Sequence, residues 1–138
     1  NVAEDFPAQR QWAMEILQRE SELQEIVQLV GSDALPDEQK MTLEVARMIR
    51  EIFLQQNAYH KVDTYCPMER QYLMMKIIRK FSDLSTKAVE GGVAVDDIVA
   101  MPLRNRLAKA KYEEAIDSEL AAIDKEMADA FESLGANA

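Results

Sequence analysis

Apolar positions follow helical spacing along the first thirty residues of the chain. They recur mostly at steps of three and four residues, as on one side of an α-helix. The stripe consists of Trp12, Ile16, Leu23, Ile26, Val27 and Val30. Proline is tolerated in the first turn of a helix, and glycine is common just past its end. We therefore predict a first helix that begins after Phe6-Pro7 and ends at Gly31.

A second apolar stripe begins a few residues after Gly31. Pro36 is a helix-start signal, and Asp37 and Glu38 would stand in the first turn, where carboxylates complement the helix dipole. The stripe consists of Met41, Val45, Met48, Ile49, Ile52 and Phe53. The two predicted helices would form a helical hairpin whose turn is the acidic stretch "GSDALPDEQK", residues 31–40.

Helical spacing is lost over residues 54–67, where polar residues alternate with Tyr59, Val62 and Tyr65, and we interpret this stretch as a structured loop. Further helical stripes follow: one from Pro67 to Gly91-Gly92, a short helical turn in "VAVDDIVAMP", and a last helix after Pro102 that breaks near Tyr112. The pattern predicts one all-α domain over residues 1–138, a bundle of about four to six helices that starts with the hairpin.

Charge and composition exclude several classes of partner. The chain has 25 acidic and 16 basic residues and a net charge of −9, whereas nucleic acids and anionic lipids require a basic surface. No apolar run approaches the roughly 20 residues of a membrane span, so we predict no direct membrane insertion. The acidic residues are spread along the chain, which favours solvated helix faces over an acidic tail.

The sequence contains no motif for self-contained catalysis. It lacks GxxxxGK[ST], GxGxxG and GxSxG, and one His with one Cys cannot form a conventional zinc site. His60, Asp63 and Cys66 stand three residues apart, but catalytic Cys and His usually come from distant parts of a chain. The favoured interpretation is a small buried thiol and a hydrogen-bonded histidine, so we predict neither a catalytic residue nor a metal site here.

Four segments in order carry a family resemblance: "NVAEDFP", the block of residues 23–67, "GGVAVDDIVAMPLRNRLAKAKY" and "MADAFESL". With them the whole chain resembles the C-terminal domain of the catalytic A subunit of V/A-type rotary ATPases, most of all the archaeal A-type ATP synthase. The resemblance implies a nucleotide-binding P-loop domain upstream of Asn1. It also implies an enzyme that couples ATP synthesis or hydrolysis to the transport of protons or sodium ions.

The resemblance further implies the surroundings of such a chain. A subunits alternate with B subunits in a ring around a central stalk rotor, on the cytoplasmic face of the cell membrane. ATP or ADP with Mg²⁺ binds the upstream domain of the intact polypeptide. The chain by itself is therefore expected to be inactive and to hold no nucleotide tightly. The alternative is a free-standing all-α adaptor module that works without nucleotide chemistry.

Two sets of site residues follow from the resemblance. The hairpin turn also resembles the acidic helix–loop–helix tip of F-type beta subunits, which rides on the central rotor shaft. This assigns rotor contact to Asp33, Ala34, Leu35, Pro36, Asp37 and Glu38. The predicted loop corresponds to the edge of the adenine pocket, which assigns that role to Gln56, Asn57, Ala58, Tyr59 and Tyr65. The alternatives are that Asp37 and Glu38 only cap their helix and that the two tyrosines are ordinary core or interdomain residues. Cys66 matches a cysteine considered redox-regulatory in some vacuolar relatives; structural burial is the alternative.

Overall fold

The computed structural model describes residues 2–51, 68–110 and 115–136, and it is helical almost throughout these ranges. It has six α-helices and one 3-10 turn there, and no strand. The elements are α1 (Val2–Val30), η1 (Ser32–Ala34), α2 (Asp37–Ile49), α4 (Met68–Glu90), α5 (Val95–Val99), α6 (Pro102–Lys109) and α7 (Ile116–Ala136). The predicted all-α bundle is confirmed.

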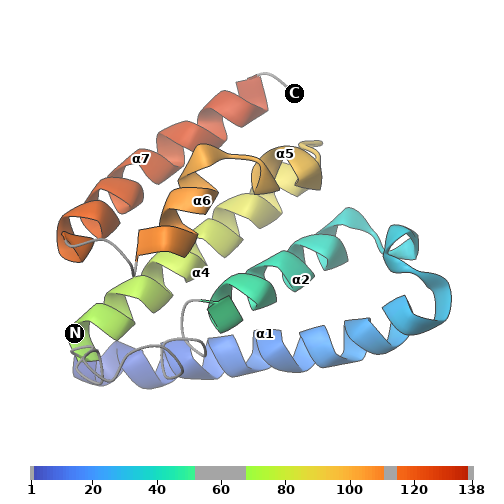
Figure 1. Ribbon diagram of the computed structural model, residues 1–138, viewed down its shortest axis with the longest axis horizontal. Coiled ribbons are helices and arrows are strands. Elements are labelled where there is room, and N and C mark those ends of the chain that lie inside the picture. The colour runs from blue at the N-terminus through green and yellow to red at the C-terminus, as the bar shows by residue number, and fades with distance from the viewer. Residues whose placement is uncertain (1, 52–67, 111–114, 137–138) are drawn as a thin grey trace.

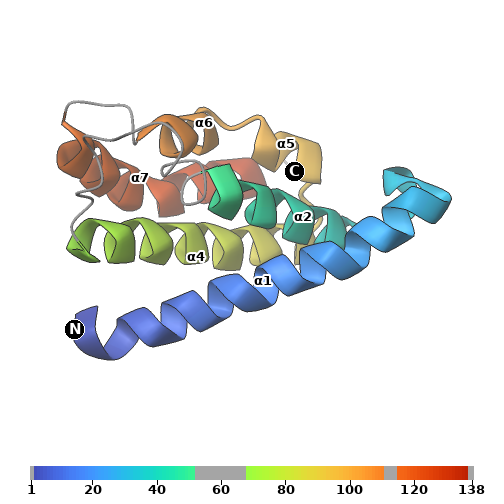
Figure 2. The same ribbon diagram turned by 60° about the horizontal axis from the view of Figure 1, so that its bottom comes forward.

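Helix α4 lies at the centre of the bundle. It packs against α1 and α2 on one side and against α7 on the other, with α6 packed on α7 (Figures 1 and 2). Phe81 of α4 is fully buried and meets Phe131 of α7 edge to face, with 5.3 Å between ring centroids. The same core contains fully buried side chains of α2, α5, α6 and α7: Val45, Met48, Ile98, Leu107, Leu120, Ile123 and Met127.

The predicted start of the first helix is wrong. Helix α1 begins at Val2, so Pro7 lies inside the helix rather than at its first turn. A proline there removes the one backbone hydrogen bond that its N–H would have made to the carbonyl four residues earlier. Close to the end of a helix of 29 residues this loss is tolerated, because the remaining turns keep their hydrogen bonds.

Glycines end two helices where the sequence predicts. Gly31 and Gly92 have φ values of 86° and 99°, a backbone region that side chains with a Cβ rarely adopt. The first glycine ends α1 and the second follows the end of α4. The predicted break in the last helix is also confirmed, since α6 ends at Lys109 and α7 begins at Ile116. Tyr112 itself lies outside the described residues.

The outer end of α1 extends beyond the rest of the bundle, carrying η1 with it (Figure 2). Ile26 and Val30 were expected in the buried stripe, but they are 42% and 63% exposed. Leu29 beside them is 85% exposed. The prediction fails at these positions because helical spacing shows which residues share a side of a helix, not how far the neighbouring helices reach.

Candidate functional site

The turn of the α1–α2 hairpin is built from short backbone contacts. The Gly31 N–H donates to the Val27 carbonyl at 2.8 Å, which closes α1, and η1 follows directly. The Pro36 carbonyl accepts from the N–H groups of Gln39 and Lys40, both at 3.0 Å, which opens α2. Leu35, between the two, is 5% exposed. The turn therefore has a buried apolar residue of its own, and its other residues, from Gly31 to Gln39, are exposed.

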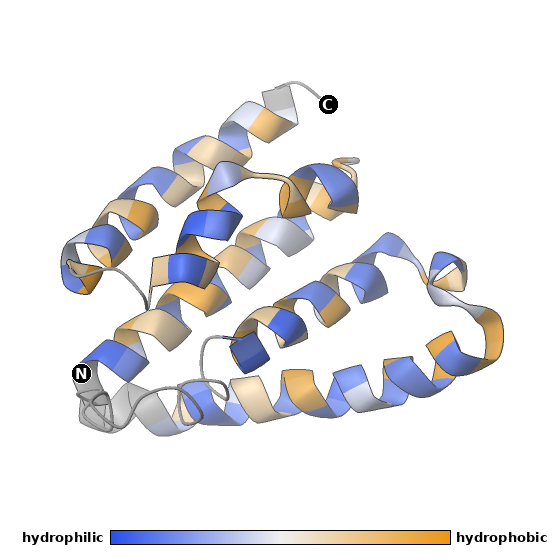
Figure 3. Cartoon of the chain, viewed as in Figure 1, coloured by the Kyte–Doolittle hydropathy of each residue, from blue (hydrophilic) through white to orange (hydrophobic). Residues whose placement is uncertain are grey.

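We define the tip surface as the exposed apolar and acidic residues at this end of the hairpin: Ile26, Leu29, Val30, Asp33, Ala34, Asp37 and Glu38. Three large apolar side chains within five residues of one helix are unusual on a solvated surface, and they mark a contact site when they cluster. Apolar and polar residues are mixed at the outer end of the hairpin (Figure 3). The sequence pattern predicts the acidic part of the tip surface but not the apolar part.

A signal for the apolar part is nevertheless present in the sequence. Ile26, Val27, Leu29 and Val30 are four apolar residues within five positions, and they cover an arc of about 160° at the 100° per residue of an α-helix. An arc wider than the roughly 100° of a core-facing stripe indicates apolar residues beyond those that face the core.

The six residues predicted to contact the rotor fall into two groups. Asp33, Ala34 and Pro36 are exposed around the turn, and Asp37 and Glu38 are exposed in the first turn of α2. Leu35 is buried, so its side chain supports the turn and does not belong to the tip surface. No side chain caps α2 by a hydrogen bond, so the two carboxylates act on this helix only through its dipole.

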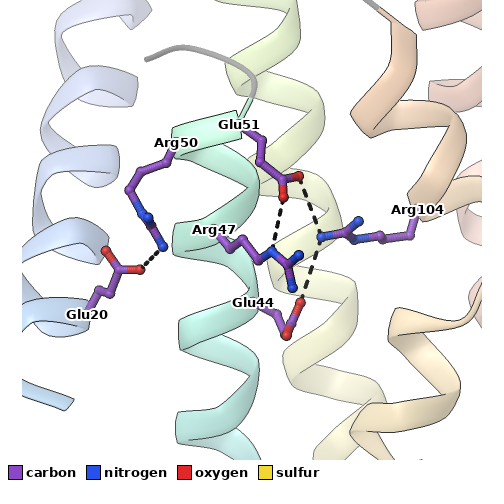
Figure 4. A network of polar contacts seen from close by, with 6 residues as sticks. All are labelled: Glu20, Glu44, Arg47, Arg50, Glu51 and Arg104. Atoms are coloured by element: carbon purple, nitrogen blue, oxygen red, sulfur yellow. Dashed lines mark hydrogen bonds and ion pairs between the residues drawn. The ribbon is translucent and has the colours of Figure 1, made fainter. Parts of the chain in front are cut away.

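The opposite end of α2 carries a network of charged side chains (Figure 4). Arg50 donates to Glu20 of α1 at 2.5 Å. Arg47 donates through Nε to Glu51 at 3.0 Å. From α6, the Nη2 atom of Arg104 lies 3.8 Å from a carboxylate oxygen of Glu44 and 3.8 Å from one of Glu51. The last turns of α2 are thus tied to two other helices by charge.

The arginine from α6 is unusually enclosed for a charged residue. The Arg104 side chain is 11% exposed, and its Nε and Nη2 atoms, like Oε2 of Glu44, are buried without a hydrogen-bond partner. Charged groups are almost never fully buried unless they are paired. Removing the partner of a buried charge therefore costs more stability than removing one from a surface ion pair. The sequence offers no local signal that Arg104 joins this cluster, because it lies far along the chain from Glu44 and Glu51.

A groove of about 550 Å³ lies between α6 and α7. Arg106 is the cation in its described lining, and it donates to Glu119 at 2.6 Å and to Glu126 at 3.1 Å. These hydrogen bonds, that to Glu119 first, raise the pKa of the Arg106 guanidinium above its usual value. Because both carboxylates already hold Arg106, the groove offers no free charge for an anionic ligand.

The remaining predicted site residues lie outside the described part of the chain. They are Gln56, Asn57, Ala58, Tyr59, Tyr65 and Cys66, together with His60 and Asp63. Their assignments stay predictions. Within the described ranges, no group of three His, Cys, Asp or Glu side chains could hold a metal ion. In the same ranges, no helix combines the length and apolar character that crossing a membrane requires.

Comparison with known proteins agrees with this architecture. The family described as the C-terminal domain of V and A type ATP synthase matches residues 1–99, which span α1 to α5. The chain belongs to this family. The A subunit of the A-type ATP synthase of Methanosarcina barkeri is 54% identical over 134 residues, 97% of this chain and 23% of that protein.

Similar proteins come from several archaea. The corresponding A subunit from Methanoculleus marisnigri is 52% identical over 98% of this chain and 23% of its own length. That from Haloquadratum walsbyi is 47% identical over 97% of this chain and again 23% of its own length. The chain thus spans about a quarter of the length of these relatives. The similarity includes α6 and α7, which lie beyond the stretch that matches the family as a whole.

Proposed function

We propose that this chain is the C-terminal domain of the A subunit of an A-type ATP synthase and that it transmits force between the central stalk rotor and the nucleotide site. The observation that carries the proposal is the tip surface, an apolar and acidic patch at the end of a hairpin that extends beyond its bundle. The relatives, which are A subunits of A-type ATP synthases, supply the assembly in which such a patch would work.

The chemistry of the tip surface suits a contact that must bind and release. Exposed ion pairs contribute only about 0–1 kcal/mol each, so Asp33, Asp37 and Glu38 would orient the contact rather than hold it. Burial of Leu29 and Val30 against the rotor would supply most of the affinity, about 1.5–3 kcal/mol for each side chain that becomes fully buried. We expect the facing rotor surface to combine apolar and basic residues.

We propose the rest of the assembly by analogy with the family. Upstream in the same polypeptide, a P-loop domain binds ATP or ADP with Mg²⁺, and Gln56, Asn57, Ala58, Tyr59 and Tyr65 contribute to the edge of the adenine pocket. A subunits alternate with B subunits in a ring on the cytoplasmic face of the membrane. Rotation is coupled to transport of protons or sodium ions, and it favours either the open or the closed form of the nucleotide site. This domain transmits the effect of rotation to that site. Cys66 is a redox site only if a second thiol lies near the P-loop.

The tip surface is tested with a double variant in the assembled enzyme. Leu29→Asn with Val30→Asn removes the exposed apolar side chains while leaving the backbone of α1 intact. We expect ATP-driven ion uptake into vesicles, divided by the rate of ATP hydrolysis in the same vesicles, to fall at least about fivefold, in line with typical coupling free energies. The ratio isolates coupling because it cancels differences in the amount of active enzyme.

Met14→Asn is the matched control. Met14 lies on the same helix and is 65% exposed, but it is far from the tip surface. It should leave the coupling ratio unchanged. A double variant with the ratio of the parent enzyme would rule out the tip surface as the rotor contact.

A further inference from the structure

Helix α6 connects the two sides of the bundle through two arginines. Arg104 and Arg106 are two residues apart, so they leave the helix on different sides. Arg104 points toward Glu44 of α2 and toward Glu51 just past the end of α2, whereas Arg106 donates to Glu119 and Glu126 of α7. One short helix therefore joins the hairpin to the long helix at the other side of the bundle.

The carboxylates that face Arg104 are spaced to fix the rotation of α2. Glu44 and Glu51 are seven residues apart, the spacing of about two helical turns, so Glu51, two residues past the end of α2, follows Glu44 on the same side. A single nitrogen of Arg104, Nη2, lies 3.8 Å from both, as Figure 4 shows. Rotation of α2 about its axis would move both carboxylates away from this nitrogen together.

The contact responds sharply to small movements of the helices. Nη2 of Arg104 and Oε2 of Glu44 are shielded from solvent, and buried charges are screened much less than exposed ones. The 3.8 Å separations exceed the roughly 2.7–2.9 Å of charge-assisted hydrogen bonds by about 1 Å. A shift of that size between α2 and α6 would convert an ion pair into hydrogen bonds. Displacement of the hairpin thus changes the strength of its connection to α6.

We propose that Arg104 is a positioning residue that makes the α1–α2 hairpin a stiff lever, by holding the inner end of α2 against α6 through Glu44 and Glu51. Arg50 and Glu20 hold the same end of α2 to α1. With both connections made, a force at the tip surface moves α1, α2 and α6 together. Without Arg104, the hairpin bends at the inner end of α2 and part of the displacement is lost.

This inference rests on the proposed function, because a lever needs a rotor to act on it. The test uses the assembled ATP synthase that carries this chain within its A subunit. Arg104→Gln removes the charge and keeps much of the length of the side chain. We expect the ratio of ATP-driven ion uptake to ATP hydrolysis to fall roughly three- to tenfold, with KM for ATP unchanged. Arg104→Lys keeps the charge as a compact ammonium in place of the planar guanidinium, and should recover part of the loss.

Arg106→Gln is the matched control. It removes an arginine from the same helix with two glutamate partners, but both partners are on α7. Its coupling ratio should equal that of the parent enzyme. Hydrogen exchange of the assembled enzymes adds a direct readout: the last turns of α2 should exchange faster in Arg104→Gln and not in Arg106→Gln.

The outcomes separate the two proposals. If Arg104→Gln keeps the parent ratio while the double variant at Leu29 and Val30 loses it, the role of Arg104 is overturned and the tip surface stands. If neither variant changes the ratio, the proposed function is overturned and this inference with it. If Arg104→Gln fails to assemble, Glu44→Gln takes its place, because it removes one carboxylate and leaves Arg104 with Glu51. A parent ratio in Glu44→Gln would then overturn the role of Arg104.

Discussion

At the scale of single residues, the ion pair between Arg70 and Asp117 joins the beginnings of α4 and α7. Arg70 donates through Nε and Nη2 to the two carboxylate oxygens of Asp117, at 3.0 Å and 3.1 Å. These hydrogen bonds hold the pKa of the Asp117 carboxyl below its usual value, against a smaller opposing effect of burial. A carboxyl whose pKa is lower in the folded chain stabilises it above the unfolded pKa of about 3.9.

Asp117→Asn should therefore lower the free energy of unfolding at pH 7 by at most about 1 kcal/mol, because the carboxylate is exposed. The difference from the parent chain should shrink as the pH falls through the folded pKa of Asp117, since the parent then loses the same interaction. Urea unfolding at pH 7 and near pH 2.5 measures both. Asp129→Asn is the control, an exposed carboxylate of α7 without an ion pair among the described residues. A difference for Asp117→Asn that is equal at both pH values would contradict the assignment.

A second residue-scale prediction concerns the backbone at the tip. Gly31 has φ 86° and ψ 157°, a region open almost only to glycine, and a Cβ there would meet no atom within 4 Å. Gly31→Ala should therefore cost about 1–3 kcal/mol by backbone strain alone. Gly135→Ala, in open space within α7, should instead be neutral or stabilise by up to about 1 kcal/mol. Thermal unfolding distinguishes the two, and equal effects would show that the turn tolerates alanine.

At the scale of elements, the sequence predicts the helix boundaries that are marked by nearby residues. Glycines, prolines and spacing correctly indicate the end of α1, the start of α2, the end of α4 and the break before α7. The start of α1 is predicted wrongly because Pro7 is assigned to the first turn of the helix. A proline is also tolerated a few residues after the helix start, as it is here. The errors thus concern boundaries, which depend on marginal differences in free energy.

The candidate site is predicted less completely than the fold, for a physical reason. The acidic residues of the tip surface follow from the hairpin and the resemblance, whereas the exposure of Ile26 and Val30 depends on how far the helices packed on α1 extend along it. Helical periodicity gives no information about the charged cluster at the inner end of α2. Arg104 meets Glu44 and Glu51 only because α6 returns to α2 after the chain has passed through α4 and α5.

At the scale of the whole molecule, one end of the α1–α2 hairpin extends beyond the bundle and the inner end of α2 is held within it. The tip surface stands at one end of the hairpin, and the charged cluster with Arg104 stands at the inner end of α2. Beyond α6, the ion pairs of Arg106 and the contact of Phe81 with Phe131 hold α7 to the centre. This arrangement in the described part of the chain is what the proposed coupling role requires.

The sequence also predicts how the chain behaves by itself. The 138 residues contain no GxxxxGK[ST] loop to hold phosphates, and the described residues offer no group that could hold a metal ion. The purified chain should therefore release no phosphate from Mg²⁺-ATP, whereas the intact A-type ATP synthase, assayed in parallel, should. The measurement is phosphate release in proportion to chain concentration, after two purification steps that separate proteins on different properties. Turnover that stays with the chain through both steps would contradict the prediction, since it would require a phosphate site built from helices alone.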